Sequence, residues 1–538
     1  MNRLQKWLAV ASTVALTSVV SSHDANAFCG FYVAPQDGPL FNDATQVALM
    51  REGTRTVISM SNNYKGPASD FAMIVPVPVV LKKENVKTLP KDVFSHLETL
   101  SAPRLVEYWE QDPCHPYQYD MTPMPSSAVM GPMPAEEKAS DRSYGVKIEA
   151  KFSVGEYDIL VLSAEQSDGL ERWLIDNHYK IPKGAGDALA PYIREQQKFF
   201  VAKINIKKVA MDAQGVAILS PLRFNYETPD FRLPVRLGLL NANGKQDLIV
   251  YVLANDKRYE VANYPTVFVP TNLDVSDDTR KSFGAFYSTL FDATLVKAGG
   301  RAVVTEYSWQ SSSCDPCPTP PLDDNDVATL GGDVLFGMAA PPPTGGAPSG
   351  VSGSPMGGYY GGGSNVVLTR LHTRYDKATL TEDLVFKAAT PVVGGREFVT
   401  GDKGQLEKGA RPDSQNNFQA RYVIRHRWTG AIACENPQRG IWGGPPGGGE
   451  QSPTAAMGLA SAPRGTVSLS TSIKSGLDDV ESWDRAAKSA DTGGAVPTVG
   501  PRPACGCQVP RREEGMGMAI AAGVGLLAII GARRSRKS

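Results

Sequence analysis

Alternation of apolar and polar residues predicts strands in the first part of this chain. Apolar runs at residues 47–50 and 56–60 flank the turn Arg51–Thr54, a pattern typical of a hairpin. Residues 71–75 predict a further strand, which should end or lie at a sheet edge at Pro76 because proline has no N–H to donate. Residues 112–143 are rich in Pro, Met and Ser and predict a loop.

In the middle of the chain, the period of two that is typical of strands occurs together with the period of 3.6 that is typical of helices. Residues 146–152 and 157–163 predict strands, and a helix should then begin at Ser167 or Asp168, with Leu170, Trp173 and Leu174 on one face. A second helix is expected over 187–198. Period-two alternation predicts strands over 200–206, 222–226, 231–239 and 418–424, and the apolar run 248–253 predicts a strand covered on both faces. We therefore expect an α+β fold with a strand-dominated mixed body.

Two Gly- and Pro-rich stretches interrupt or follow this body. Residues 337–364 predict a disordered insertion between the ordered segments 28–336 and 365–442. Residues 443–504 are rich in Gly, Pro, Ser and Thr and predict a flexible stalk, because such a composition buries little apolar surface.

The first residues have the pattern of an export signal. Arg3 and Lys6 precede an apolar stretch, and Ala25-Asn26-Ala27 fits a small-x-small cleavage site, so residues 1–27 predict a signal peptide cut between Ala27 and Phe28. A retained membrane anchor is the alternative, but the stretch is shorter than the roughly 20 residues that a span needs. We expect the mature chain to leave the cytoplasm.

The last residues, 505–538, combine a cysteine pair, an apolar run and a basic end. Residues 516–532 carry no charge and would reach about 25 Å as a helix, near the lower limit for a transmembrane helix. The basic residues Arg533, Arg534, Arg536 and Lys537 follow it and favour a cytoplasmic end, with the body outside. A buried core helix is the alternative.

This three-part tail resembles the C-terminal sorting signal of myxobacterial surface proteins. In that family a membrane protease is thought to cut near the cysteine motif before the protein is anchored at the cell surface. The resemblance implies that Cys505 or Cys507 takes part in sorting and that residues 516–532 are a transient membrane helix; a plain permanent anchor is the alternative. Five glycines in and beside residues 516–532 support transience, because glycine weakens a helix by up to about 1 kcal/mol relative to alanine.

Export determines how the seven cysteines are interpreted. Cys29, Cys114, Cys314, Cys317 and Cys434 lie in the body, and in an oxidising compartment such residues are mostly disulfide partners. An odd number leaves at least one of them unpaired within the body.

The pair Cys314-Asp315-Pro316-Cys317 is the one candidate for chemistry. A thiol oxidoreductase needs its first thiol at a helix N-terminus, which lowers the thiol pKa. Pro320 and Pro321 follow closely and oppose a helix there. We therefore favour a structural disulfide, within the pair or to Cys29, Cys114 or Cys434, over redox catalysis or zinc binding.

Other candidates have ordinary explanations. His115 beside Cys114 is bracketed by prolines in a loop, and Asp323–Asp326 lacks the spacing of a calcium loop and suits a helix start. Arg421, Arg425 and Arg427, near Trp428, could bind anionic sugars but more simply form a solvated strand face. A net charge of −1 argues against a nucleic-acid partner. We assign no catalytic, cofactor-binding or metal-ligating residue.

Several motifs of the body carry a second resemblance. The motifs Phe28-Cys29-Gly30-Phe31-Tyr32, SDFAMIVPVPVV (69–80), CDPCPTPPL (314–322), LTRLHTRYDKATLTEDLVF (368–386) and ACENP (433–437) are similar to an uncharacterised family of exported bacterial proteins, domain of unknown function 2330. The resemblance covers about residues 28–440 and implies export and one ordered body, but no activity.

These features predict a non-enzymatic protein displayed on the cell envelope, with a role in binding, adhesion or envelope structure. Its partners would be the membrane, a processing protease and an envelope or extracellular ligand. The alternative is an exported enzyme, either a thiol oxidoreductase that uses Cys314 and Cys317 or a hydrolase without a recognised motif.

Overall fold

The computed structural model describes residues 45–61, 71–115, 146–211, 217–240, 244–339, 365–397, 405–446 and 453–491, except positions 178, 180, 457, 460 and 461. It also describes short strands at 31–33, 41–42, 64–65 and 399–400. Residues 1–27, 340–364 and 505–538 lie outside the described residues, so the predictions for the signal peptide, most of the 337–364 insertion and the tail are not tested.

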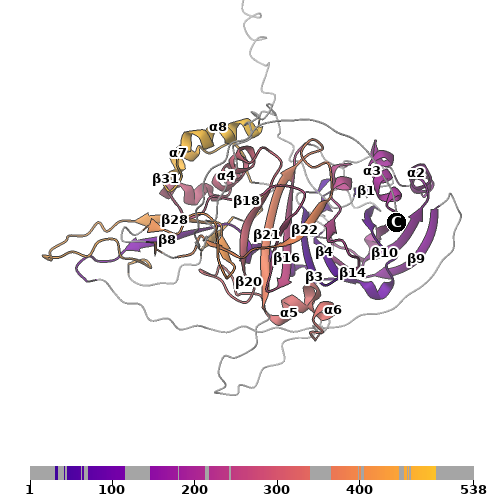
Figure 1. Ribbon diagram of the computed structural model, residues 1–538, viewed down its shortest axis with the longest axis horizontal. Helices are drawn as coiled ribbons and strands as arrows, with labels where there is room; N and C mark the ends of the chain where they lie inside the picture. The colour runs from indigo at the N-terminus through magenta and orange to yellow at the C-terminus, as the bar shows by residue number, and fades with distance from the viewer. Residues whose placement is uncertain are drawn as a thin grey trace, which may run out of the picture. The chain divides into compact units, whose positions relative to one another are not determined.

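A mixed sheet of 11 strands forms the centre, with β21, β16, β3 and β4 in its middle (Figure 1). The predicted hairpin is confirmed as β3 (Thr45–Glu52) and β4 (Arg55–Ser61), and Gly53 at its turn has a φ of +55°. β16 (Gln246–Asn255) pairs in parallel with β3 and antiparallel with β21 (Val366–Tyr375). The other strands are β7 (Val86–Thr88), β14 (Leu222–Glu227), β18 (Thr266–Phe268), β20 (Val303–Gln310), β23 (Val392–Gly394), β26 (Arg411–Pro412) and β27 (Asn417–Gln419).

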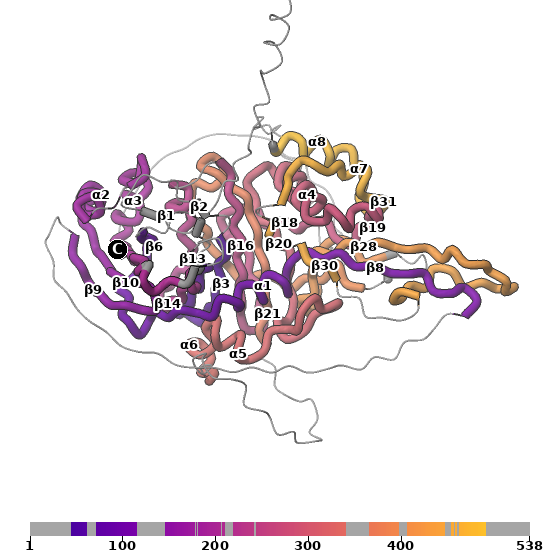
Figure 2. The backbone as a smooth tube through the Cα atoms, turned by 180° about the vertical axis from the view of Figure 1, so that it is seen from behind, coloured from indigo at the N-terminus to yellow at the C-terminus, as the bar shows by residue number. Residues whose placement is uncertain are grey.

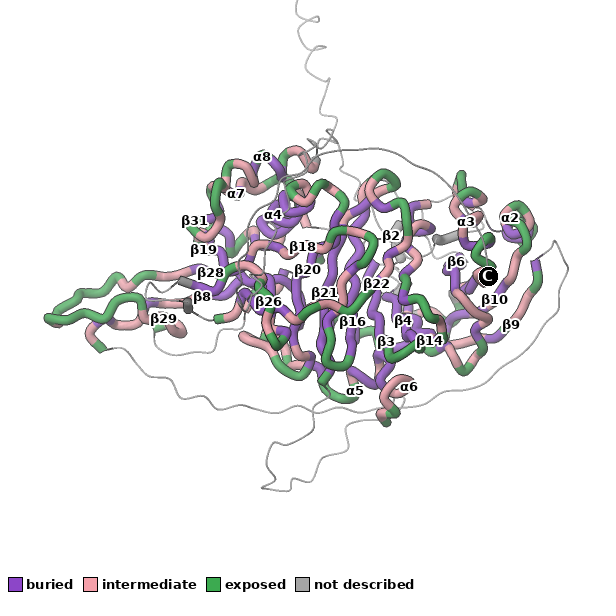
Figure 3. Tube along the Cα trace, in the orientation of Figure 1, coloured by how far each residue is buried: buried purple, intermediate pink, exposed green. Residues whose placement is uncertain are grey.

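Both faces of the central sheet are covered. Val47, Val250 and Leu371 on one face share a core with Phe152 and Phe200 of a second sheet. The opposite face packs against α1 (Asp92–Ser101) and α4 (Phe283–Lys297). Residues 246–254 are buried throughout, as Figure 3 illustrates, and this confirms the prediction of a strand covered on both faces.

The second sheet has five strands, in the order β1 (Phe31–Val33), β6 (Ala72–Val77), β11 (Lys198–Ile204), β10 (Tyr157–Ala164) and β9 (Val146–Val154). Among the described residues, β1 pairs with residues 72–74 and only β11 pairs with Pro76, as expected for a proline. α2 (Ser167–Asp176) is the predicted helix and buries Leu170, Trp173 and Leu174. α3 (Ala185–Arg194) ends four residues before the predicted end, because β11 begins at Lys198.

A third sheet of six strands extends the molecule. It contains β8 (Arg104–Glu110), β19 (Leu273–Val275), β28 (Arg421–His426), β29 (Trp442–Gly443), β30 (Thr454–Ala455) and β31 (Ile473–Ser475). β8 and β28 run in parallel, and the chain beyond them is mostly exposed (Figures 1 and 3). We call residues 107–115 and 425–446 the arm.

The remaining elements are small. β15 (Arg232–Leu233), β22 (Leu384–Ala389) and β17 (Arg258–Val261) form one sheet. Three strand pairs are β2 (Phe41–Asn42) with β5 (Tyr64–Lys65), β12 (Ala210–Met211) with β13 (Ala217–Ile218), and β24 (Val399–Thr400) with β25 (Gln405–Leu406). 3₁₀ turns cover Lys83–Asn85, Ile206–Lys208, Arg236–Leu240 and Asp277–Ser282, and a π turn covers Ala328–Gly332 between α5 (Asp324–Val327) and α6 (Asp333–Leu335).

The predicted stalk at 443–504 was wrong over residues 453–491. This segment, which we call the C-terminal segment, contains α7 (Leu469–Ser472), β31 and α8 (Val480–Asp491). Figure 2 shows α7 and α8 beside α4 from behind, and Leu469, Ala486 and Ala487 join the core of α4. The prediction failed because it used the composition of residues 443–504 as a whole, whereas one part of them forms an amphipathic helix. In that helix Trp483, Ala486 and Ala487 are spaced to share one face.

One predicted strand was also wrong. Residues 231–239 alternate in polarity, but only Arg232–Leu233 are extended, and Arg236–Leu240 form a 3₁₀ turn. All five apolar residues are buried nonetheless. The body is thus a strand-dominated mixed α+β fold, and none of its described helices is long and apolar enough to span a membrane.

Candidate functional site

Four of the predicted disulfide cysteines are paired. Cys314 bonds to Cys317, and Cys114 bonds to Cys434 across 320 positions of sequence. The first pairing is one of those that the sequence left open, whereas the second had no sequence signal. Cys29, Cys505 and Cys507, and the cleavage residues Ala27 and Phe28, lie outside the described residues.

Residues 314–317 follow strand β20, and we call them the 314–317 loop. Gln419 Nε2 donates to the carbonyl of Asp315, and Arg104 Nη1 donates to the carbonyl of Pro316 at 2.6 Å. Cys317 is exposed and Cys314 is half-buried. The next helix, α5, starts only at Asp324, so neither thiol would lie at a helix N-terminus, which agrees with the prolines at 318, 320 and 321.

The acidic run after this loop is a helix start, as predicted. Asp323 caps α5 by accepting from the Asp326 N–H at 2.8 Å, and Asp326 accepts from the Asp323 N–H at 3.1 Å. Such reciprocal bonds satisfy two N–H groups that the first turn leaves unpaired. The Asp326 carboxylate also lies 3.2 Å from His96 Nδ1, which ties α1 to α5.

Beneath the 314–317 loop lie two fully buried arginines, which we call the arginine pair. Arg104 on β8 and Arg421 on β28 occupy paired positions of a parallel ladder, and each is 0% exposed. This corrects the sequence interpretation of Arg421 as part of a solvated face. The reason is that residues 314–316 and the region of Tyr108 cover this side of the strands.

The hydrogen bonds of the arginine pair are incomplete. Arg104 donates to the carbonyls of Leu100 and Pro316, whereas its Nε has no partner. Arg421 donates from Nε to Asn272 at 2.8 Å and from Nη1 to the Tyr108 hydroxyl at 3.2 Å, whereas its Nη2 has no partner. Tyr307 OH and Gln419 Oε1 are also buried and unpartnered. Burial lowers the pKa of Arg104, and the charge of Arg421 acts in the same direction.

A second buried group, which we call the central cluster, lies between the central sheet and α4. Glu306 of β20 accepts from Arg370 Nε at 2.6 Å and from the Tyr287 hydroxyl at 2.6 Å. His372 lies between two carboxylates, with Nδ1 2.8 Å from Glu306 and Nε2 3.0 Å from Asp247. Burial alone would lower the pKa of His372, but these two carboxylates outweigh it and raise the pKa.

The C-terminal segment completes the central cluster. Arg464 donates to Asp247 at 2.9 Å and to Asp292 of α4 at 2.7 Å, and Asp292 also accepts from Arg374. Three carboxylates therefore face three arginines and one histidine. Burial would raise the pKa of Glu306, but His372 and Arg370 outweigh it and lower the pKa to about 2.

The central cluster has the partners of a charge relay but no access for a substrate. His372 is 1% exposed, and the ring of Phe291 stacks on it with a centroid separation of 4.0 Å. The most exposed side chains of the cluster, Arg374 and Arg464, are only 18% and 11% accessible. The arrangement therefore serves to join β20, β21, α4 and the C-terminal segment.

The arm carries tryptophan and arginine side chains on an exposed framework. Trp109 stacks on His426 at 4.6 Å, Arg425 lies over Trp442 at 5.2 Å, and all three rings are half-buried. Glu110 holds the arm together by accepting from Arg439 at 2.7 Å, and this bond lowers the pKa of Glu110 to about 2. The Cys114–Cys434 disulfide closes the arm.

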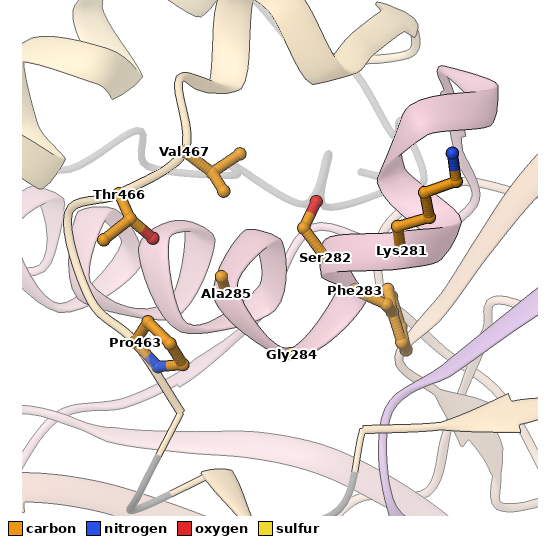
Figure 4. Close-up of a pocket in the computed structure, with 8 residues that line it drawn as sticks. All are labelled: Lys281, Ser282, Phe283, Gly284, Ala285, Pro463, Thr466 and Val467. Carbon is orange, nitrogen blue, oxygen red and sulfur yellow. The ribbon is translucent and has the colours of Figure 1, made fainter.

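Two further possibilities carry little chemistry. Among the described residues, no group of three His, Cys, Asp or Glu side chains is placed to hold a metal ion. A hollow of about 470 Å³ at the start of α4 is lined by residues such as Lys281, Phe283, Pro463 and Val467, as Figure 4 shows. Of the described residues that line it, Lys281 alone is charged, and no histidine, cysteine or carboxylate accompanies it.

Comparison with known protein families gives a match over most of the chain. No curated protein and no solved structure matches the chain. A family model, described as an uncharacterised protein conserved in bacteria, matches residues 23–387, about two thirds of the sequence. The matched range is shorter than the expected 28–440 at its C-terminal end; it includes Arg104 and the 314–317 loop but not Arg421 or Cys434. The chain therefore belongs to this bacterial family, DUF2330.

Proposed function

We propose that the protein is exported and displayed on the cell envelope, where it acts as a non-enzymatic binding protein through its arm. The pattern of a signal peptide at 1–27 and the two disulfides support export, because disulfides persist in oxidising compartments. Display rests on the tail: residues 516–532 would enter the membrane, and Cys505 or Cys507 would be the sorting residue that a membrane protease recognises.

One observation carries the assignment of the binding surface. The arm exposes residues 427, 429–433 and 435–440 to solvent, yet the Cys114–Cys434 disulfide and the Glu110–Arg439 ion pair fix its conformation. Tryptophan and arginine dominate the energetics of macromolecular interfaces, and a pre-ordered surface loses less entropy on binding. The expected partner is an envelope or extracellular macromolecule.

The arm can be tested with a matched pair of variants. Ile432 on the arm and Ile175 on α2 are both large apolar residues that are exposed, 40% and 52% respectively. Purified labelled protein is added to intact cells that lack the gene, and bound label is measured. Ile432→Ala and Trp442→Ala should reduce binding, whereas Ile175→Ala should not. Equal binding by all variants would refute the assignment.

Display is tested separately. Mass analysis of the C-terminal peptide from purified envelopes should show a chain that ends before Ser538 and a modification at Cys505 or Cys507. An intact, unmodified C-terminus on surface-exposed protein would indicate a permanent anchor instead. Unprocessed protein in the cytosol with free thiols would contradict export.

The enzyme alternatives have less support. A thiol oxidoreductase would need Cys314 or Cys317 at a helix start, and α5 begins seven residues after Cys317. A hydrolase that used the central cluster would need an opening to His372, which Phe291 covers. Binding is the function that the exposed, covalently closed arm favours.

A further inference from the structure

The arginine pair at the base of the arm has an unbalanced charge. Arg104 and Arg421 are adjacent on parallel strands, which are separated by about 4.8 Å, and their side chains lie on the same face. Among the residues that the structure describes, no carboxylate forms an ion pair with either guanidinium. Asp315 and Glu397 are near enough to influence the charges, but they make no direct contact with them. Two buried like charges are unfavourable unless a counter-charge compensates them.

The pair also retains free hydrogen-bond donors. Arg421 Nη2 is buried without a partner, and Arg104 Nε makes no hydrogen bond of normal geometry. The Tyr307 ring lies 5.5 Å from the Arg104 guanidinium, and its hydroxyl is near enough to act against the lowering of the Arg104 pKa. Guanidinium groups match the oxygens of carboxylate, sulfate and phosphate in geometry and charge. An oxyanion would therefore supply both missing acceptors and the missing negative charge.

The 314–317 loop covers the guanidinium groups of the arginine pair. The Pro316 carbonyl accepts from Arg104 Nη1, and the Asp315 carbonyl accepts from Gln419, the last residue of β27, two positions before Arg421. The Cys314–Cys317 disulfide joins the two ends of this four-residue loop. The covalent link therefore holds the Pro316 carbonyl oxygen against Arg104 and the Asp315 carbonyl oxygen against Gln419, and it keeps the charge of Asp315 near enough to act on Arg104.

The geometry points to a disulfide-gated anion site: Arg104 and Arg421 bind a small oxyanion, and the oxidised 314–317 loop covers them until the Cys314–Cys317 bond is reduced. This goes beyond the proposed function, since it places a small-ligand site at the base of the arm rather than on its surface.

The opening step requires a dithiol reductant. Its thiolate attacks one sulfur of the Cys314–Cys317 bond, and that bond breaks as a mixed disulfide forms. The reductant's second thiolate then attacks the mixed disulfide, so that both cysteines are released as thiols and the reductant becomes a disulfide. Cys317 is the exposed sulfur and is the accessible point of attack.

The test measures binding of inorganic phosphate and sulfate to the purified mature protein by titration calorimetry at constant ionic strength. Dithiothreitol serves as the reductant because it carries no charge of its own. The double variant Cys314→Ser/Cys317→Ser mimics the open loop without reductant, and Cys114→Ser/Cys434→Ser is the matched control that removes the other disulfide.

We expect the Cys314/Cys317 variant to bind the anions at least about tenfold more tightly than the oxidised protein, because charge-assisted bonds replace the loop contacts. Reduced wild-type protein should match it, and the Cys114/Cys434 variant should not differ from oxidised wild type. Equal affinity in all forms would overturn the proposal, as would a gain that persists when Arg421→Gln is added.

Because Arg421→Gln is a core substitution, a milder variant keeps the test decisive. Asp315 lies at the half-buried surface, and its carboxylate opposes an incoming anion. Asp315→Asn should strengthen phosphate binding in both redox states. A merely structural role for the loop predicts no change, and that result would also overturn the proposal.

Discussion

The central cluster and the arginine pair are both buried beside the same sheets, yet they are built differently. In the central cluster each guanidinium faces a carboxylate, and His372 lies between two of them. In the arginine pair the partners are carbonyl, amide and hydroxyl oxygens instead of carboxylates. Both groups leave two guanidinium nitrogens without a partner, Arg104 Nε and Arg421 Nη2 in the pair and Arg370 Nη2 and Arg374 Nε in the cluster, so the counter-charge is what distinguishes them. Balanced charge indicates a structural joint, whereas unbalanced charge indicates a place where a ligand can add what is missing.

The strongest test of the balanced side is Glu306→Gln. It keeps the shape of the side chain but leaves Arg370 without a counter-charge and His372 with Asp247 alone, so we expect a loss of about 3–5 kcal/mol in the free energy of unfolding. Chemical denaturation measures this loss. Glu227→Gln, in the exposed pair with Arg55, is the control and should change stability by less than about 1 kcal/mol. Similar losses of stability for the two variants would show that Glu306 contributes no more than a carboxylate in an exposed ion pair.

Arg464→Ala should have the next largest effect. Asp247 and Asp292 retain His372 and Arg374, so the expected loss is smaller, about 2 kcal/mol. The loss should be local, because Arg464 fastens the C-terminal segment: amide hydrogen exchange over 469–491 should accelerate while that of β16 does not. Lys474→Ala, at an exposed pair, should leave exchange unchanged.

Within the central cluster, Glu306 and His372 should give the stability opposite dependences on pH. The pKa of Glu306 is about 2 in the folded protein and lies below its ordinary value of 4.5, so its contribution is complete above pH 4.5 and is lost as the pH falls towards 2. The raised pKa of His372 acts in the opposite sense: its contribution is present below pH 6.5 and is lost as the pH rises through the folded value.

Each of these two groups can change stability by at most about 1.4 kcal/mol per pH unit. Denaturation of wild type and of His372→Asn across pH 5–9 measures the second effect, and the alkaline decline should disappear in the variant. A decline that persists there would assign it to another group.

The smallest effect is expected at the arginine pair. Arg421→Met relieves the repulsion with Arg104 while it leaves Asn272 and Tyr108 without their donor, so the two terms should cancel to within about 1 kcal/mol. Arg370→Met, at the balanced site, should cost clearly more in the same denaturation experiment. Equal costs would show that the two arginines experience equivalent environments.

Local patterns predicted local structure well. The β3–β4 hairpin, α2 with its buried Trp173, and the doubly covered strand β16 all follow from residues that are neighbours in sequence. Strand β21, for which no strand was predicted, shows the limit. Arg370, His372 and Arg374 alternate with apolar or small residues, a pattern typical of a half-exposed strand, but α4 and Arg464 cover that face. Such covering depends on contacts that the periodicity does not encode.

The candidate sites were less predictable than the fold. The 314–317 loop was recognisable, because two cysteines and the prolines at 316, 318, 320 and 321 constrain it locally. Arg104 and Arg421 lie 317 positions apart, and Cys114 and Cys434 lie 320 apart, so only the parallel pairing of β8 with β28 brings each couple together. A single sequence contains no signal for that pairing.

The attachment of α8 to the body changes how far the protein could stand from a membrane. If residues 516–532 enter a bilayer, the chain between them and Asp491 is 24 residues, which can reach no more than about 80 Å. A free chain from residue 443 would have allowed roughly three times that distance. The body would therefore be tethered close to the lipid surface, and any partner of the arm would have to be found within that short range.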